Sequence, residues 1–210
     1  MAREIRKHLP SVTFVLVTLL VLGALGGAFI YVGAYNVGAD APHSSLVFGA
    51  LEQLRERSIA HYARRVSLPA DLNDPKRVAA GAGLYNEMCT VCHLGPGLER
   101  SELSQGLYPS APELALGDDL TPAEQFWVIK HGVKLTAMPA WGKTHDDQLI
   151  WDMVAFIRQL PKMNPAQYRA AVASAPESHE EMMEHMAGAR HDRGPEPQGA
   201  GREGPAADHD

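Results

Sequence analysis

The stretch NEMCTVCHLGPG, residues 86–97, decides how this sequence folds. It contains the only two cysteines among the 210 residues, Cys89 and Cys92, and His93 directly follows the second of them. Two thiols at this spacing lie about one helical turn apart. The stretch therefore places two sulfur atoms and one imidazole close together. The question is which kind of site uses these three groups.

Four chemistries use a Cys-x-x-Cys pair: a redox disulfide, half of a zinc site, a structural bridge and haem attachment. Structural zinc needs four ligands, and the sequence has no second cysteine pair. A thioredoxin-like pair follows a strand, and no clear strand precedes Cys89. His93 favours the last chemistry, because Cys-x-x-Cys-His is the attachment pattern of c-type haem. Both thiols would form thioethers with the porphyrin, and the imidazole would bind its iron. A chance match in a protein with a simple disulfide is the alternative.

A second axial ligand decides whether such an iron binds small molecules or only passes electrons. Met138 lies in GVKLTAMPAWG, residues 132–142, directly before Pro139. A residue before proline is pushed out of helical geometry, so Met138 should sit in an extended loop that presents its thioether. Trp141 is close enough to pack on the porphyrin. We expect Met138 as the second ligand, with His131 as the runner-up; a histidine at a helix end is the simpler reading of His131.

The N-terminal part of the chain predicts a membrane anchor. Residues 12–34 are free of charge, and about 23 residues at about 1.5 Å each exceed a hydrocarbon core of about 30 Å. The basic residues Arg3, Arg6 and Lys7 precede them, so the remainder should be exported to the periplasmic side of a bacterial inner membrane. A cleaved signal peptide is the alternative, with Ala-Asp-Ala at 39–41 as its site, although Pro42 would follow the cut.

Helix signals surround the cysteine motif, and no convincing strand appears. Asp74 and Pro75 form an N-cap and first helical residue for a helix that runs into Cys89. Residues 121–124 form a capping box for a second helix that stops at Gly132. A third begins within 144–147 and ends at Pro161, with its apolar positions on one face. The predicted fold class is therefore all-α.

Residues 74–165 resemble a class I cytochrome c, with CxxCH near the start, a methionine downstream and a closing helix. More narrowly, YNVGADAPHS at 35–44 and FWVIKHGVKLTAMPAWG at 126–142 resemble bacterial membrane-anchored monohaem cytochromes c. The resemblance implies three to five helices around one covalent haem c, preceded by a transmembrane helix. It also implies an electron carrier, or a subunit of an oxidoreductase complex, and no enzyme activity of its own.

The resemblance further implies supporting contacts. In the family the first and last helices cross at a small residue and an aromatic, which Gly81 and Tyr85 match, with Trp151 or Phe156 opposite. A proline-x-leucine step supplies a carbonyl to the proximal imidazole. Pro112 and Leu114 match that step best, Pro96 is nearer in sequence, and an ordinary turn is the simpler role for Pro112.

We expect five segments: a cytoplasmic start, the anchor, a juxtamembrane helix with its linker, the haem domain and a largely disordered tail. Their boundaries are 1–11, 12–35, 36–73, 74–165 and 166–210. Apolar residues at 46–54 follow a helical spacing. That helix either packs on the haem domain as a spacer or docks a membrane-bound redox partner.

The tail groups imidazoles and thioethers that suit soft copper, or another divalent ion held weakly. They are His179, Met182, Met183, His185 and Met186. A solvated acidic tail with incidental histidine and methionine is the simpler interpretation.

Three functions from different classes follow. The first is a one-electron carrier between a dehydrogenase, a quinol-oxidising complex or a terminal oxidase; the second is a haem enzyme or gas sensor with an open iron. The third is a copper-handling protein that uses the tail.

The net charge of −6 gives no reason to expect a nucleic-acid partner. Lys130, Lys134 and Lys143 flank Met138 and suit an acidic partner, although lysines there are equally ordinary surface.

Overall fold

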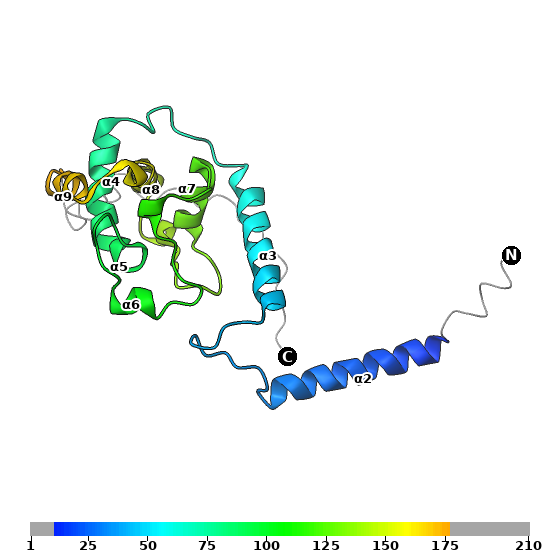
Figure 1. Ribbon diagram of the computed structural model, residues 1–210. Coiled ribbons are helices and arrows are strands. Elements are labelled where there is room, and N and C mark those ends of the chain that lie inside the picture. Colours follow the sequence, from blue (N-terminus) through cyan, green and yellow to red (C-terminus); the bar gives the residue numbers. More distant parts are fainter. Residues whose placement is uncertain (1–10, 177–210) are drawn as a thin grey trace. The chain divides into compact units, whose positions relative to one another are not determined.

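The computed structural model describes residues 11–176, and every regular element within them is a helix (Figure 1). The predicted all-α class is confirmed. The chain forms two compact units, one that ends at His43 and one that begins at Ser44. The predictions for residues 1–10 and for the tail metal set fall on residues outside the described part of the chain. The tail set is His179, Met182, Met183, His185 and Met186.

The first unit contains α2, Val12–Tyr31. Ser11 caps it by accepting a hydrogen bond from the backbone N–H of Phe14 at 3.1 Å. Its 20 residues, with an 18-residue window of mean hydropathy 2.4, make it long and apolar enough to cross a membrane by length and composition. Beyond it, the ring of Tyr35 stacks on His43 and its hydroxyl is hydrogen-bonded to the imidazole Nδ1.

In the second unit, α3, Ser45–Ala63, packs on α7, Pro122–His131. Ile59 is buried near the end of α3, and the ring of Tyr62 stacks on Trp127 at 5.8 Å between centroids. Of the apolar residues expected at 46–54, Val47 and Leu51 are half-buried, whereas Leu46 is 82% and Leu54 66% exposed. A helix of 10 residues, such as α7, is about half as long as α3 with its 19, so it covers only part of α3.

The centre of the second unit is the crossing of α4, Pro75–Met88, with α8, Asp147–Ile157 (Figure 1). The two backbones touch at Gly81, where a Cβ would collide with the carbonyl of Asp152 and lie 2.9 Å from the Cβ of Phe156. The ring of Tyr85 lies 5.6 Å from that of Phe156. Phe156 is therefore the aromatic partner at the crossing.

The helix starts follow the predicted caps. Asp74 accepts from the N–H of Lys76 at 2.8 Å to open α4. Thr121 and Glu124 form the reciprocal capping box of α7. The shorter elements are α5 (Thr90–His93), α6 (Glu102–Gln105), η1 (Leu114–Leu116), η2 (Trp141–Lys143), η3 (Leu160–Lys162) and α9 (Pro165–Ala173).

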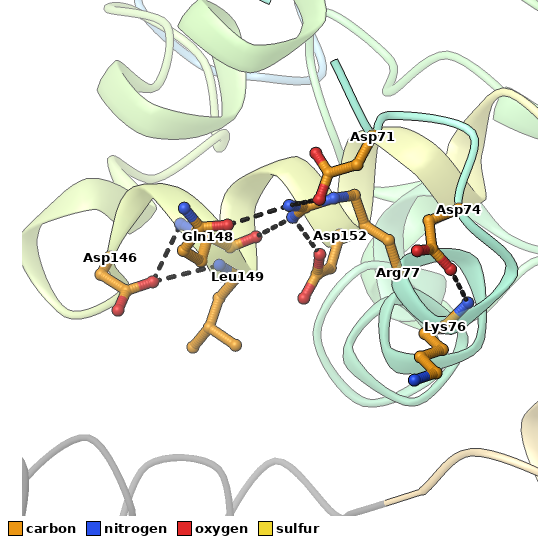
Figure 2. A network of polar contacts seen from close by, with 8 residues as sticks. All are labelled: Asp71, Asp74, Lys76, Arg77, Asp146, Gln148, Leu149 and Asp152. Atoms are coloured by element: carbon orange, nitrogen blue, oxygen red, sulfur yellow. Dashed lines mark hydrogen bonds and ion pairs between the residues drawn. The ribbon is translucent and has the colours of Figure 1, made fainter. Parts of the chain in front are cut away.

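A polar network ties α4 to α8 and to the linker before α4 (Figure 2). The guanidinium of Arg77 donates to Asp152 Oδ1 at 2.5 Å and to Asp71 Oδ2 at 2.8 Å. It also donates to the side-chain oxygen of Gln148 at 3.0 Å. One cation thus joins three segments beside the crossing, with its side chain only 10% exposed.

Replacing Gly81 by alanine should destabilise the protein by about 1–3 kcal/mol or more, because the new methyl group meets backbone that cannot move aside. The matched control is Gly49→Ala in α3, where nothing lies within 4 Å of the added Cβ. That control should gain about 0.5–1 kcal/mol from helix propensity. Chemical denaturation measures both, and equal effects would contradict the close crossing.

The stability should also depend on the ionisation of Asp152. Burial raises its pKa from 3.8 to about 6, against the attraction of Arg77. Between about pH 4 and 6 the folded protein therefore binds more protons at Asp152 than the unfolded chain does, so the free energy of unfolding falls as pH rises through this window. The hydrogen bond from Arg77 lowers the pKa of Asp71. The stabilisation of the fold by ionised Asp71 is therefore lost only as the pH falls below that window. Denaturation at stepped pH should show a flatter profile for Asp152→Asn, whereas Asp119→Asn, an exposed control, should keep the parent profile.

Candidate functional site

The end of α4 and the single turn of α5 position the two cysteines. The backbone N–H groups of Cys92 and His93 donate to the carbonyl of Cys89 at 3.2 and 2.8 Å, which fixes the pair one turn apart. The thiols are not joined in a disulfide. Cys89 is buried and Cys92 half-buried, and burial raises the pKa of the Cys89 thiol to about 12. Two thiols that are not joined to each other therefore lie one helical turn apart, and the first of them belongs to the core.

His93 has one ring nitrogen engaged by the protein. Its Nδ1 lies 2.9 Å from the carbonyl oxygen of Pro112. A carbonyl only accepts, so Nδ1 carries the hydrogen and Nε2 keeps a lone pair for a ligand. Burial lowers the pKa of His93, against the opposing effect of that hydrogen bond, which favours the neutral imidazole that metals bind.

Met138 lies in a loop that is stabilised by hydrogen bonds between the residues of the loop itself. The N–H of Val133 donates to the carbonyl of Met138 at 3.2 Å. Thr136 Oγ1 accepts from the N–H of Met138 at 3.1 Å and donates to the carbonyl of Val133 at 2.8 Å. Gly132 has a φ of 66°, and a Cβ there would lie 2.7 Å from the Met138 carbonyl oxygen. The extended position of Met138 is thus set by the neighbouring loop.

The candidate residues converge on one apolar cluster. Tyr85 and Cys89 belong to the buried core, and Leu114, Met138 and Trp141 pack against it half-buried. The hydroxyl of Tyr85 donates to the carbonyl of Leu94 at 2.6 Å, directly after His93. The core therefore receives contributions from the cysteine turn, the Pro112 segment and the Met138 loop.

These residues fit a covalently attached haem. Two unpaired thiols, a neutral imidazole with Nε2 available and a presented thioether are the donors that such a group needs. By contrast, in the part of the chain that the structure describes, no three His, Cys, Asp or Glu side chains come together as they would around zinc.

Three residues at this site were missed from the sequence. Thr136 fixes Met138, Leu94 adopts a positive φ of 59°, and Tyr168 of α9 contacts the segment after His93. A threonine two positions before a methionine carries no pattern of its own. Tyr168 lies on a helix beyond the expected haem domain, 74–165. The only sequence signal for that helix is the capping box formed by Asn164 and Gln167.

Residues 76–157 match the family described as cytochrome C oxidase, cbb3-type, subunit III. The match includes Cys89, Cys92, His93 and Met138, and it ends with α8. No curated protein matches the chain.

Replacing Thr136 by valine should loosen the Met138 loop, because the shape is kept while both hydrogen bonds are lost. A loss of about 1–2 kcal/mol corresponds to roughly five- to thirtyfold faster amide exchange at Met138. Hydrogen exchange measures it, and Thr136→Ser, which keeps the hydroxyl, is the control. Equal exchange in both variants would contradict this role.

Proposed function

We propose, from the premise that residues 76–157 form a c-type cytochrome domain, that this protein is a membrane-anchored one-electron carrier. The observation that carries the proposal is the donor set: two unpaired thiols and a neutral His93 in one turn, and a half-buried Met138 packed against the core to which Cys89 belongs. Haem c, when attached, supplies an iron that cycles between ferrous and ferric at the comparatively high potential of His/Met ligation.

The chain's own residues would divide the work in four ways. Cys89 and Cys92 would attach the group, and His93 and Met138 would ligate its iron. The carbonyl of Pro112 would orient the imidazole and raise its basicity through the bond at 2.9 Å. Leu114, Trp141 and Tyr85 would exclude water from the core side. With both axial positions taken by protein, electron transfer is favoured over binding of small molecules.

The site would lie outside the cytoplasm. The helix α2 is long and apolar enough to cross a membrane, and the basic residues before it favour a cytoplasmic N-terminus. We propose that α2 is retained as a single-pass anchor of a bacterial inner membrane, with the haem domain on the periplasmic side. The first four segments expected from the sequence stand as part of this proposal, with 74–165 as the haem domain. The expected tail, 166–210, begins with residues that form α9, Pro165–Ala173, instead of a disordered segment.

The surface around Met138 suits an acidic redox partner. Residues 125–145 contain three lysines and no aspartate or glutamate. Lys130 is paired with Asp147 at 2.6 Å, which leaves Lys134 and Lys143 as exposed cations. Beside Lys134, Leu135 is 82% exposed. An apolar tip among cations is complementary to a partner surface with an apolar centre and an acidic rim. A terminal oxidase, which the family description names, a dehydrogenase and a quinol-oxidising complex are the candidate partners.

Spectroscopy of the purified protein tests the proposal. The pigment should survive denaturation and extraction with acidic solvent, since thioethers hold it. The ferric protein should show the weak long-wavelength band of iron–thioether bonding, and Met138→Ala should lose it while the control Met163→Leu keeps it.

Two results would contradict the proposal. A colourless protein, or one whose pigment is extracted, would exclude covalent haem. A band unchanged in Met138→Ala would exclude that ligand, and ready carbon monoxide binding to the reduced parent would favour the open-iron alternative.

A further inference from the structure

Helix α9 lies beyond the matched domain and closes over the segment that follows His93. Tyr168, 2% exposed, sets its ring against Gly95, where a Cβ would lie 3.0 Å from the ring carbon Cζ. Pro165 stands against Gly97 in the same way, 2.7 Å from the position of an added Cβ. Two glycines after the histidine thus admit two side chains of α9.

Tyr168 also bonds to the end of α4. Its hydroxyl donates to the side-chain oxygen of Asn86 at 3.0 Å, and the carbonyl of Asn86 accepts from Thr90 Oγ1 at 2.6 Å. Burial raises the pKa of Tyr168 to about 12, so the hydroxyl stays a neutral donor. Through the bond to Asn86 and the ring contact with Gly95, Tyr168 touches residues on both sides of Cys89.

The segment between these contacts is strained. Leu94 has φ 59° and ψ −171°, a region that residues other than glycine rarely occupy. Such a conformation is unfavourable for a residue with a side chain and persists only where the surroundings impose it. Here the hydroxyl of Tyr85 holds the Leu94 carbonyl at 2.6 Å, and Tyr168 covers the next residue. Two tyrosines from two helices therefore hold the backbone directly after the proximal histidine.

We infer that Tyr168 is a positioning residue for the haem-binding turn, acting with Tyr85 on residues 94–95. The inference rests on the proposed function. By holding this backbone closed, Tyr168 fixes the orientation of His93 and keeps water away from the turn. A drier site disfavours the more highly charged ferric form, so α9 raises the reduction potential of the carrier.

The test uses the full-length protein with its pigment and three variants. Tyr168→Phe keeps the ring and loses the bond to Asn86, and Tyr168→Leu loses both. Arg169→Ala, an exposed neighbour on α9, is the control. The potential should fall in the order parent, Tyr168→Phe, Tyr168→Leu, and the control should equal the parent. Retention of the long-wavelength band in each variant shows that Met138 still binds, which separates this effect from loss of that ligand.

A double-mutant cycle tests the contact itself. Gly95→Ala should lower the potential in the parent, because its methyl group meets the Tyr168 ring, and should have little further effect in Tyr168→Leu. Amide exchange at residues 94–97 should rise in Tyr168→Leu but not in Arg169→Ala.

The outcomes separate this inference from the function on which it rests. If Tyr168→Phe and Tyr168→Leu keep the parent potential while only their unfolding midpoints fall, α9 merely stabilises the fold and the inference is wrong. If the parent protein carries no covalent pigment, the proposed function fails instead, and amide exchange at 94–97 still decides whether Tyr168 holds the turn.

Discussion

The close approach of α4 and α8 is the constraint on which the second unit depends. A glycine at position 81 lets the backbone of one helix lie against the carbonyl of Asp152 on the other. Side chains beside so close a crossing must fit the limited space there, and the rings of Tyr85 and Phe156 pack against each other at it. This contact fixes the register of the two helices. The direction of α4 then fixes where Cys89 emerges, because α5 continues directly from the end of α4. The position of the candidate site is thus a consequence of a contact one to two turns away from it.

The fold was predictable where local chemistry determines it. Caps at Asp74 and Thr121 set helix starts that the structure reproduces within a residue, because the first N–H groups of a helix have no acceptor within the helix itself. The extent to which α3 is covered could not be predicted from the sequence. Spacing shows that a helix has an apolar side, but the length of its neighbour decides how much of that side is covered, and Leu46 and Leu54 remain exposed.

Some residues of the candidate site could likewise be recognised from the sequence, and others could not. The motif residues Cys89, Cys92 and His93 are recognisable because one chemistry requires that spacing. The residues around these groups are not recognisable in the same way. Thr136 makes two hydrogen bonds within the Met138 loop, Leu94 adopts an unusual backbone angle, and Tyr168 makes one hydrogen bond and one ring contact. Such contacts depend on three-dimensional packing between distant segments. The reactive groups of a site can therefore be predicted from the sequence, whereas the residues that orient them cannot.

The packing of α3 against α7 has a consequence for where the carrier can act. Because α3 belongs to the second unit, the connection between that unit and α2 is limited to residues 32–43. Even fully stretched, a dozen residues reach only about 40 Å. With α2 retained in the bilayer as proposed, the carrier would search a thin layer above the lipid surface, and its encounters would depend on lateral diffusion within that layer. Docking sites that project farther into the surrounding space would be out of its range, however well their charges matched.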